Sequence, residues 1–471
     1  MWTKETINDL VTRQKQYFRT NETLDIDWRI RQLKRLKTAL SLYEDDLIAA
    51  LMSDLGRSET EAYLADIGSV IMEINETIQG LKRWARPELH LSGPACFPSI
   101  FTRVYKMPYG TSLIISPFNF PVMLSIGPLA AAIAGGNTAV IKASSKSPAT
   151  TRALQKILSD IFPEEYVAVV DGGHDIADLC LEERFDKIFY TGSPKVGSHV
   201  MEMASHNLTP VALELGGETG NWAIVRKDAE IFDAARKIAF FKIMNSGQIC
   251  INVNQVAVEE SIAEEFIDCL KSEIGRQIGT DPLTNPEYPH LINRDAYDKC
   301  AAQAAEYADR IYCGGHGDPD TLRFEPTVIY PVGTDEEIVK HELFSPLLPV
   351  VPYKEDEEDA LLDIIASREH GLAFYLFTTD KARAKEIMTT QQYGGGCINE
   401  VCLHLMVKGV PFNGTGHSGM GAYHGEWGFR EFTHPQTVLF GSTKFNLPLR
   451  EHPYSGLEGD WKLPVLKKFQ R

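Results

Sequence analysis

The sequence predicts an α/β fold in which helices cover parallel sheets. Short β-branched or apolar runs, each closed by turn residues, alternate with segments long enough for a helix, and this alternation is typical of parallel sheets. The series occurs twice along the chain, so we expect two α/β units. A chain of 471 residues, 44% hydrophobic and 24% charged, is long enough for two or three domains.

The first expected element is an amphipathic helix from about residue 30 to residue 51. Leu33, Leu36 and Leu40 recur there at helical spacing, with Lys and Arg between them. The next distinctive segment, residues 87–108, is rich in Pro and Gly and contains short alternating runs. We expect it to form a hairpin or arm that leaves the main body.

Four short runs after this arm are expected to be strands of the first sheet, and they read GTSLIISP, GNTAVIKAS, YVAVVDGG and FDKIFYTGS. A second series begins near NWAIVRKD and ends near GGCINE, where we expect the second sheet. Neither series contains an internal repeat or a low-complexity tract.

The charge of the chain argues against two classes of partner. The formal net charge is -17, whereas nucleic acids and anionic membranes require clustered Lys and Arg. The longest apolar stretch, PVMLSIGPLAAAIAGG, is interrupted by Pro128 and is too short to cross a bilayer. We therefore expect neither nucleic acid binding nor a membrane span.

The cysteines and the amino terminus predict a cytoplasmic location. Eight cysteines are scattered without CxxC spacing, in a chain too long to need disulfide bonds for its stability. The first residues are charged and lack the apolar core of a secretory signal. The segment HELFS lacks a second histidine four residues after His341, so we expect no metal site.

Two glycine-containing motifs are candidates for binding a phosphate. GTGHSG, residues 414–419, has the letters of a dinucleotide fingerprint but lacks the strand before it and the helix after it that this motif requires. FYTGSPKVG is better placed. A strand-like run ends in Thr191-Gly192-Ser193, and we expect a helix to begin at Pro194. By itself the second motif is equally compatible with a plain strand-to-helix turn.

Four further segments occur in the order of the signature segments of the NAD(P)-dependent aldehyde dehydrogenases: SPFNFP, VALELGG, GQIC and ELFSP. The chain resembles this superfamily from about residue 54 to residue 440. The segments SGMGAYHGEWGF, PFNGTGHSG and HPYS are most similar to the short dimeric class 3 branch, which oxidises aromatic and medium- to long-chain aliphatic aldehydes. The resemblance implies an aldehyde, NADP or NAD, and a homodimer assembled through the arm.

The resemblance assigns catalytic roles to three residues. Cys250 is the thiol that adds to the aldehyde carbonyl, although a lone cysteine is more often a buried small hydrophobe, and the other seven keep that interpretation. Asn119 supplies a side-chain amide to the oxyanion, beside the N–H of Cys250, and would otherwise be a turn former. Glu214 fits the general base that activates water, and its alternative is an exposed carboxylate at a strand end.

The resemblance also assigns residues to the cofactor site. Without the resemblance, these residues would be interpreted as ordinary strand-end, turn and core residues. Lys142 corresponds to a ligand of the adenosine ribose, Ser193 to a ligand of the pyrophosphate, Glu342 to an acceptor of the nicotinamide ribose, and Phe344 to a residue beside the nicotinamide. The neighbouring residues expected in the cofactor site are Ser145, Gly192 and Leu215.

Four positions depart from the pattern of the superfamily. Ser145 stands where an acidic ribose ligand is usual, and the next residue is Lys146. Phe118 replaces a tryptophan, Glu218 a lysine, and Ser345 a glycine. None of these changes removes a catalytic group, and the change at Ser145 predicts that NADP is accepted at least as well as NAD.

The expected architecture is the aldehyde dehydrogenase fold, with a Rossmann-like dinucleotide-binding domain, an α/β catalytic domain and a β oligomerisation arm. We assign residues 1–86 and 109–213 to the dinucleotide-binding domain and 214–425 to the catalytic domain. Residues 87–108 and 426–471 then form the arm and the C-terminal tail. The alternatives are a thiol-dependent esterase that uses no nucleotide and a non-catalytic binding protein on the same fold.

The lining of the substrate pocket is also expected from the sequence. Its candidates are Phe120, Met123, Met244, Ile249 and the loop VCLHLM.

Overall fold

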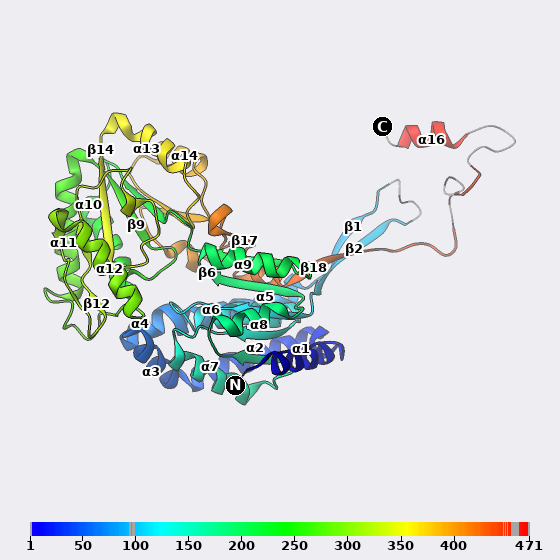
Figure 1. Cartoon of the computed structure of the whole chain (residues 1–471). Helices are drawn as coiled ribbons and strands as arrows, with labels where there is room; N and C mark the ends of the chain where they lie inside the picture. Colours follow the sequence, from blue (N-terminus) through cyan, green and yellow to red (C-terminus); the bar gives the residue numbers. More distant parts are fainter. Residues whose placement is uncertain are drawn as a thin grey trace.

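A computed structural model of the protein describes residues 2–93, 96, 99–445, 447, 449, 451–453 and 461–469. Two large sheets, each between layers of helices, make up the body, and a narrow three-stranded sheet projects from it (Figure 1). The two α/β units expected from the repeated strand series are therefore confirmed.

The first sheet has the strand order β17-β7-β6-β3-β4-β5. Its five central strands are parallel, and β17 is antiparallel to β7 at one edge. Leu113 and Val140 face one core cluster, and their neighbours Ile114 and Ile141 face the other, as the period of two in a strand requires. The bounds are β3 Thr111–Ile115, β4 Thr138–Lys142, β5 Val167–Val170, β6 Lys187–Gly192, β7 Val211–Leu215 and β17 Gly419–Met420.

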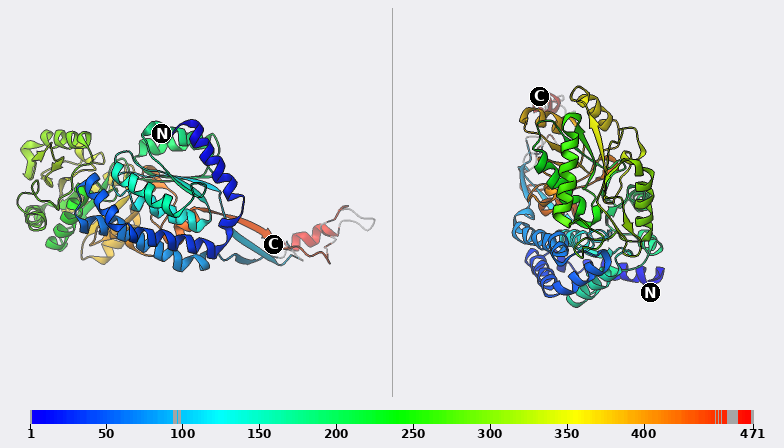
Figure 2. Two further views of the ribbon diagram at one scale, coloured as in Figure 1. Left: turned by 90° about the horizontal axis from the view of Figure 1, so that it is seen from below. Right: turned by 90° about the vertical axis from the view of Figure 1, so that its left-hand side faces the viewer.

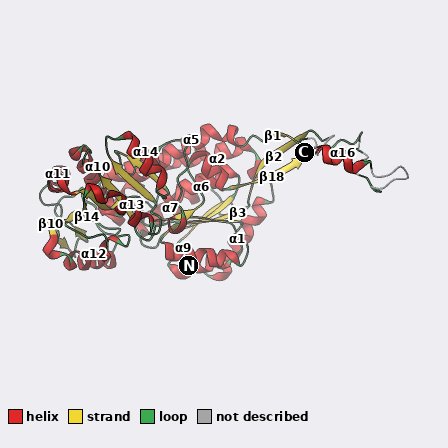
Figure 3. Ribbon diagram, turned by 90° about the horizontal axis from the view of Figure 1, so that it is seen from above, coloured by secondary structure: helices red, strands yellow, loops and turns green. Residues whose placement is uncertain are grey.

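Helices cover both faces of the first sheet, above and below its strands in the view of Figure 3. One layer contains α1 Lys4–Phe18, α8 His174–Glu182 and α9 Pro194–Ser205. The other contains α2 Ile26–Leu42, α3 Glu44–Leu55, α5 Gly68–Trp84, α6 Met123–Gly135, α7 Pro148–Ile161 and α15 Gly425–Glu431. A sheet buried on both faces explains the nearly continuous apolar runs of its strands.

The second sheet has the strand order β10-β13-β14-β9-β8-β15-β16, and only β10 is antiparallel. Its bounds are β8 Asn221–Val225, β9 Val253–Glu259, β10 Ile311–Cys313, β13 Thr327–Ile329, β14 Leu347–Tyr353, β15 Ala373–Phe377 and β16 Gly395–Ile398. One face packs against α10 Ile231–Ile243 and α11 Ala263–Ile278. The other packs against α12 Arg294–Glu306, α13 Glu358–Ala366 and α14 Lys381–Thr390.

The prediction of a single helix between residues 30 and 51 is wrong, because two helices occupy this stretch. Leu33, Leu36 and Leu40 are buried as predicted, but α2 ends at Leu42 and α3 begins at Glu44. Tyr43 between them leaves the helical conformation, with φ -103° and ψ 21°. The hydroxyl of Tyr43 donates to Asp160 at 2.6 Å, and the acidic first turn of α3 favours a new helix start there.

The projecting sheet contains the expected hairpin. Strands β1 (Glu88–Leu91) and β2 (Phe101–Pro108) are antiparallel, and β18 (Thr433–Leu439) pairs with the other edge of β2. Figure 1 and the left panel of Figure 2 show this sheet extending away from the body, with α16 (Lys462–Phe469) beyond it. Parts of the expected arm and tail, residues 94–95, 97–98 and 454–460, lie outside the described residues.

Two shorter helices follow one another directly before α5: α4 (Glu59–Ala62) and the π-helix η2 (Tyr63–Ile67). A two-stranded sheet of β11 (Gly317–Asp318) and β12 (Arg323–Phe324) lies outside the large sheets. Among the described residues no helix is both long and apolar enough to cross a membrane, and no group of three or more His, Cys, Asp or Glu is arranged to hold a metal ion.

Candidate active site

Cys250 lies in a tight turn between α10 and β9. Three successive residues of this turn, Asn245, Ser246 and Gly247, have left-handed φ values of 49°, 51° and 74°. A side chain at position 247 would collide with the backbone of Ser345, so glycine is required there. The Cys250 carbonyl accepts a hydrogen bond from Asn221 Nδ2 at 2.8 Å, which fixes the end of the turn to β8.

Asn119 lies beside this turn, in the loop that follows β3. It is buried, and its Nδ2 donates to the carbonyl of Gln248 at 3.1 Å. A side-chain amide carries two N–H groups, so this bond orients the amide and leaves the second N–H for another acceptor. The loop after β3 and the turn that carries Cys250 are therefore directly joined.

Glu214 is on β7, where it stands in register between Thr191 of β6 and Gly419 of β17. The side chain is buried, and Oε2 has no hydrogen-bond partner. Burial raises its pKa well above the usual value, and the nearby charge of Glu431 raises it further. A carboxylate in this state is a stronger base than an exposed one.

The Cys250 thiol is half-buried and faces two carboxyl groups. Burial raises its pKa to about 12, and the charges of Glu342 and Glu214 add to the rise. The backbone N–H groups of Cys250 and Ile251 act in the opposite direction, because they donate to the thiolate. The thiol is therefore close enough to both carboxyl groups to be affected by their charge, and its turn is bonded to the Asn119 loop.

An apolar cavity of about 160 Å³ opens onto Cys250. The four residues expected individually all contribute to it, as do four residues of the loop VCLHLM, whereas Val401 and His404 of this loop do not. The expected lining residues found there are Phe120, Met123, Met244, Ile249, Cys402, Leu403, Leu405 and Met406. Sequence reasoning missed the aromatic side chains of Phe240, Phe241, Phe412 and Tyr423, which come from α10 and from the segment near β17.

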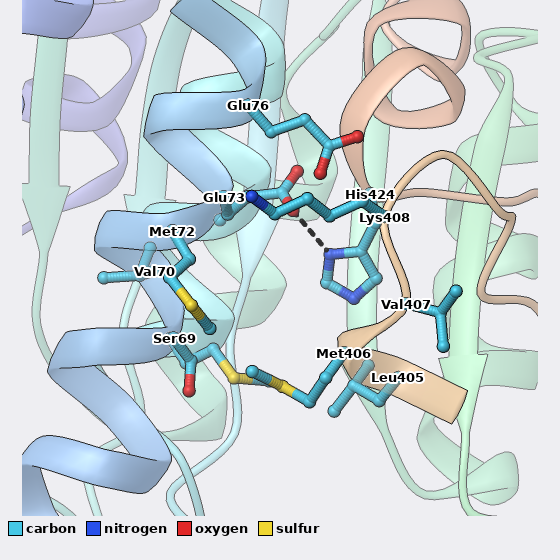
Figure 4. A pocket seen from close by; sticks show the side chains of 12 residues that line it. Ser69, Val70, Met72, Glu73, Glu76, Leu405, Met406, Val407, Lys408 and His424 are labelled. Atoms are coloured by element: carbon cyan, nitrogen blue, oxygen red, sulfur yellow. Dashed lines mark hydrogen bonds and ion pairs between the residues drawn. The ribbon is translucent and has the colours of Figure 1, made fainter. Parts of the chain in front are cut away.

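A smaller cavity of about 50 Å³ adjoins the first and shares Ser69, Met123, Leu405 and Met406 with it. Its outer part is polar. Figure 4 shows His424 Nδ1 bonded to Glu73 at 3.1 Å, while Nε2 points toward Met406 and has no partner. The smaller cavity thus adds the polar side chains of Glu73, Glu76, Lys408 and His424 beside the apolar cavity at the thiol.

The expected cofactor residues on the first sheet lie at the carboxyl ends of β4, β6 and β7, which form a single edge of a parallel sheet. Lys142 is buried at the end of β4, and its Nζ donates to the carbonyls of Ala143 and Gly172 at 2.9 and 2.7 Å. Burial lowers its pKa, and an ammonium has a third N–H to offer a ligand. Ser145 follows in an exposed turn.

The turn after β6 is built as the start of a helix. Ser193 is the N-cap of α9, with its Oγ accepting from Val196 N at 3.5 Å, and Pro194 occupies the first turn. Gly197 packs closely against Leu215, because an added Cβ would lie 2.8 Å from the Leu215 side chain. Free N–H groups and the helix dipole make this end suitable for a phosphate.

Glu342 and Phe344 come from the loop before β14. Glu342 lies against Gly216, where any larger residue would displace its carboxyl group. Oε1 of Glu342 is buried without a partner, and burial raises its pKa to about 8. Phe344 adopts a left-handed φ of 51° and meets the ring of Phe118 edge-on at 5.9 Å.

These observations fit a nicotinamide dinucleotide. The partnerless oxygen of Glu342 is an acceptor for a ribose hydroxyl, and the amino end of α9 is a donor set for the pyrophosphate. Ser193 lies directly after the end of β6, and the carboxyl group of Glu342 lies against Gly216, directly after β7.

The fold and the site together define an aldehyde dehydrogenase. Residues 1–438 match the aldehyde dehydrogenase family, and the chain belongs to this family. The expected aldehyde dehydrogenase fold and an NAD(P)-dependent aldehyde-oxidising activity are confirmed at the level of the family.

The chain is similar to a 4,4'-diaponeurosporen-aldehyde dehydrogenase of Staphylococcus aureus, with 36% identity over 442 residues, 94% of this chain and 95% of the relative. It is 34% identical over 451 residues to aldehyde dehydrogenase family 3 member H1 of Arabidopsis thaliana, covering 95% of this chain and 92% of that one. The substrate-bound structure of Staphylococcus aureus AldH matches the whole of both chains, with a TM-score of 0.94 and 34% identity. The resemblance to class 3 is therefore confirmed.

Proposed function

We propose that this aldehyde dehydrogenase oxidises an aromatic or a medium- to long-chain aliphatic aldehyde to its carboxylic acid, through a thiohemiacetal and a thioester on Cys250. The observation that carries the proposal is the apolar cavity of about 160 Å³ that ends at the thiol. Such a lining favours a substrate that loses apolar surface to it on binding. The Staphylococcus aureus relative is named for a carotenoid aldehyde, which agrees with a large apolar substrate.

The first half of the reaction builds an oxyanion on the substrate. The Cys250 sulfur, after losing its proton, adds to the carbonyl carbon, and the carbonyl oxygen becomes negative. Asn119 Nδ2 and the Cys250 N–H are the donors that meet this charge. Glu342 and Phe344 would hold the nicotinamide end of the cofactor, which would supply the hydride acceptor, and loss of hydride from the carbon lets the carbonyl reform as a thioester on Cys250.

The second half releases the acid. Glu214 takes a proton from a water molecule, and the resulting hydroxide adds to the thioester carbon. The tetrahedral adduct then expels the Cys250 sulfur as a thiolate, the acid leaves, and return of the proton from Glu214 to the sulfur restores both the thiol and the carboxylate. The buried, partnerless Oε2 of Glu214 suits this role, because no resident donor competes for it.

The cofactor is NADP or NAD, held by residues at the sheet edge. Lys142 and Ser145 are proposed for the adenosine ribose, and Gly192 with Ser193 for the pyrophosphate. The remaining proposed contacts are Leu215, Glu342 and Phe344. Ser145 is exposed and uncharged, so it does not repel a 2'-phosphate.

We further propose the expected division into domains, with 1–86 and 109–213 for the dinucleotide, 214–425 for catalysis, and 87–108 and 426–471 for the arm and tail. The exposed apolar side chains of the projecting sheet, including Leu89 and Leu91, support a homodimer. The free cysteines described for this chain support a cytoplasmic location.

A panel of aldehydes tests the proposed substrate class, with formation of reduced nicotinamide as the signal. We expect kcat/KM to rise from acetaldehyde through hexanal to decanal and to be high for benzaldehyde. A preference for small polar aldehydes would contradict the substrate class. Hydrolysis of a nitrophenyl ester without nucleotide reduction by any aldehyde would instead favour a thiol esterase.

A further inference from the structure

We propose that Arg57 is a positioning residue whose buried guanidinium holds Asn119 in place relative to the Cys250 thiol. The inference deepens the proposed function, on which it rests, and concerns the loop between α3 and α4. Arg57 does not line the apolar cavity in which the substrate is placed, so it acts on the reaction through the residues that it holds, and chiefly through Asn119.

The guanidinium joins the two segments that form the oxyanion site. Arg57 is 1% exposed, and its Nη2 donates to the backbone carbonyl of Asn119. Its Nε donates to Asn245 Oδ1 at 3.1 Å, in the left-handed turn before Cys250. The plane of Arg57 also stacks over the ring of Phe120, 4.5 Å from its centroid. One rigid group with fixed donor directions therefore spans both loops.

Two carboxylates complete the network. Asp66, in the π-helix, accepts from Arg57 Nη1 at 2.6 Å and from the Met123 backbone N–H at 2.6 Å. Glu61 accepts from the Asn245 backbone N–H at 2.8 Å and lies 3.5 Å from Arg57 Nε. Single π-turns often occur at functional sites, and here the π-helix directs Asp66 into the core.

Folding alone does not require this arrangement. Burying a cation with carboxylates costs desolvation energy, and well-packed apolar residues often stabilise a core as well or better. The network instead fixes the distance between the loop that carries Asn119 and the turn that carries Cys250. Asn245 Nδ2 donates to the carbonyls of both Asn119 and Gln248 at 3.0 Å, so the position of Arg57 sets the position of both.

The separation matters because the oxyanion donor acts over a short range. Loss of one such donor typically slows a reaction by about 10²- to 10³-fold, and a displacement of about 1 Å can cost about 10²-fold. The free N–H of Asn119 must point at the oxygen that becomes negative when Cys250 adds. A displaced Asn119 carbonyl moves that N–H with it.

A double-mutant cycle tests the inference with Arg57→Lys and Asn119→Ala, measured as the single-turnover rate of reduced nicotinamide formation with hexanal. Lysine keeps the charge but cannot direct donors to three acceptors, so we expect Arg57→Lys to slow the unmutated enzyme by about 10- to 100-fold. In the Asn119→Ala background the same change should cost less than about 3-fold, because the amide it positions is gone.

Equal losses from Arg57→Lys in both backgrounds would overturn the inference, since a general structural defect acts whether or not Asn119 is present. The nucleotide dissociation constant of the folded variant should change little, whereas its Tm should fall, because lysine cannot replace all the buried hydrogen bonds of Arg57. Arg29→Lys is the matched control, because Arg29 is also buried but donates to the carbonyls of Thr23, Leu24 and Ala134, away from the site.

Asp66→Asn provides a second variant if Arg57→Lys does not fold. It removes the charge that orients Arg57, and we expect the same dependence of the loss on Asn119. An additive result with Asp66→Asn would also overturn the inference. The proposed function fails separately, if the Cys250→Ser variant still oxidises hexanal.

Discussion

At the scale of single residues, burial in the site disfavours the charged forms of one thiol and two carboxyl groups. Cys250, Glu214 and Glu342 each have a raised pKa, and burial is the largest cause for all three. The charges of Glu342 and Glu214 also raise the pKa of the thiol, so a change of charge at either carboxyl group alters how readily Cys250 loses its proton. The reaction removes a proton from Cys250 in its first half, whereas Glu214 accepts a proton from water in the second half, so the two roles can be separated by the step in which each acts.

Cys250→Ser should abolish acid formation, whereas Glu214→Gln should allow the first hydride transfer and then stop at the thioester, because the base acts only in deacylation. A burst of reduced nicotinamide with little turnover is the expected trace for Glu214→Gln, followed by stopped-flow absorbance. Cys269→Ser is the matched control, since Cys269 is a free cysteine on α11, does not line the substrate cavity, and should leave the burst and the turnover in place. Unmutated turnover in Glu214→Gln, with no added nucleophile, would show that another group is the base.

Glu342 should make the stability of the protein depend on pH. Burial raises its pKa from 4.5 to about 8, so between these values the folded protein retains a proton that the unfolded chain has lost. The free energy of unfolding must then fall as pH rises through this window. The free energy of unfolding of Glu342→Gln should therefore rise relative to that of the unmutated protein as the pH rises. Between about pH 5 and about pH 8.5 this difference should change by on the order of 3 kcal/mol, since each pKa unit corresponds to about 1.4 kcal/mol.

Urea unfolding at the two pH values measures this difference. Glu287→Gln, at an exposed carboxylate, should show no comparable dependence on pH. The same stability gap at both pH values for Glu342→Gln would mean that Glu342 is ionised in the folded state throughout.

At the scale of elements, the periodic parts of the chain could be predicted and the contacts between loops could not. Apolar runs closed by turn residues predicted β3, β4, β5 and β6, because a strand buried on both faces leaves a local signal. The break at Tyr43 was missed, since its partner Asp160 lies 117 residues away. For the same reason Asn119 and Cys250 could be named from their segments, whereas Arg57 and Asp66, which join those segments only in the fold, left no signal.

The turn between β4 and α7 should set the choice of nucleotide. Ser145 is exposed there, after Lys142, and the Nζ of Lys146 lies 5.4 Å from the centroid of the Phe118 ring. With no carboxylate at position 145, we expect NADP to be used at least as well as NAD. Ser145→Glu should shift the ratio of kcat/KM toward NAD by on the order of 1 to 3 kcal/mol, the usual size of a charge-assisted contact.

Comparison of kcat/KM for the two nucleotides in both proteins measures the shift. Ser159→Glu is the control, because it adds the same charge to the exposed side of α7. A strong preference of the unmutated protein for NAD would contradict this prediction and leave the family assignment unchanged.

At the scale of the whole molecule, the site is assembled from both sheets. The loops after β3 and β7 belong to the first sheet, and the turn before β9 and the loop before β14 belong to the second. Two asparagines of the second sheet hold its turn and its loop. Asn221 of β8 donates to the carbonyl of Cys250 at 2.8 Å, and Asn254 of β9 accepts from the backbone N–H of Leu343 at 2.8 Å. The projecting sheet takes no part in these contacts, so its apolar side chains require another explanation.

The projecting sheet should hold two copies of the chain together. In β1, Leu89 and Leu91 are 62% and 82% exposed, and in β2 Phe101, the register partner of Leu91, is 46% exposed. An apolar strand at the edge of a sheet is a template for pairing with another chain, and closed symmetric dimers are the commonest result.

We expect the protein at micromolar concentration to have twice the chain mass of 52.6 kDa. The double variant Leu89→Lys/Leu91→Lys should run as a monomer, because lysines on an edge strand oppose pairing. Light scattering after size exclusion measures both masses, and Leu42→Lys, at an exposed leucine of α2, should remain a dimer. A double variant that stays dimeric would place the interface elsewhere on the molecule.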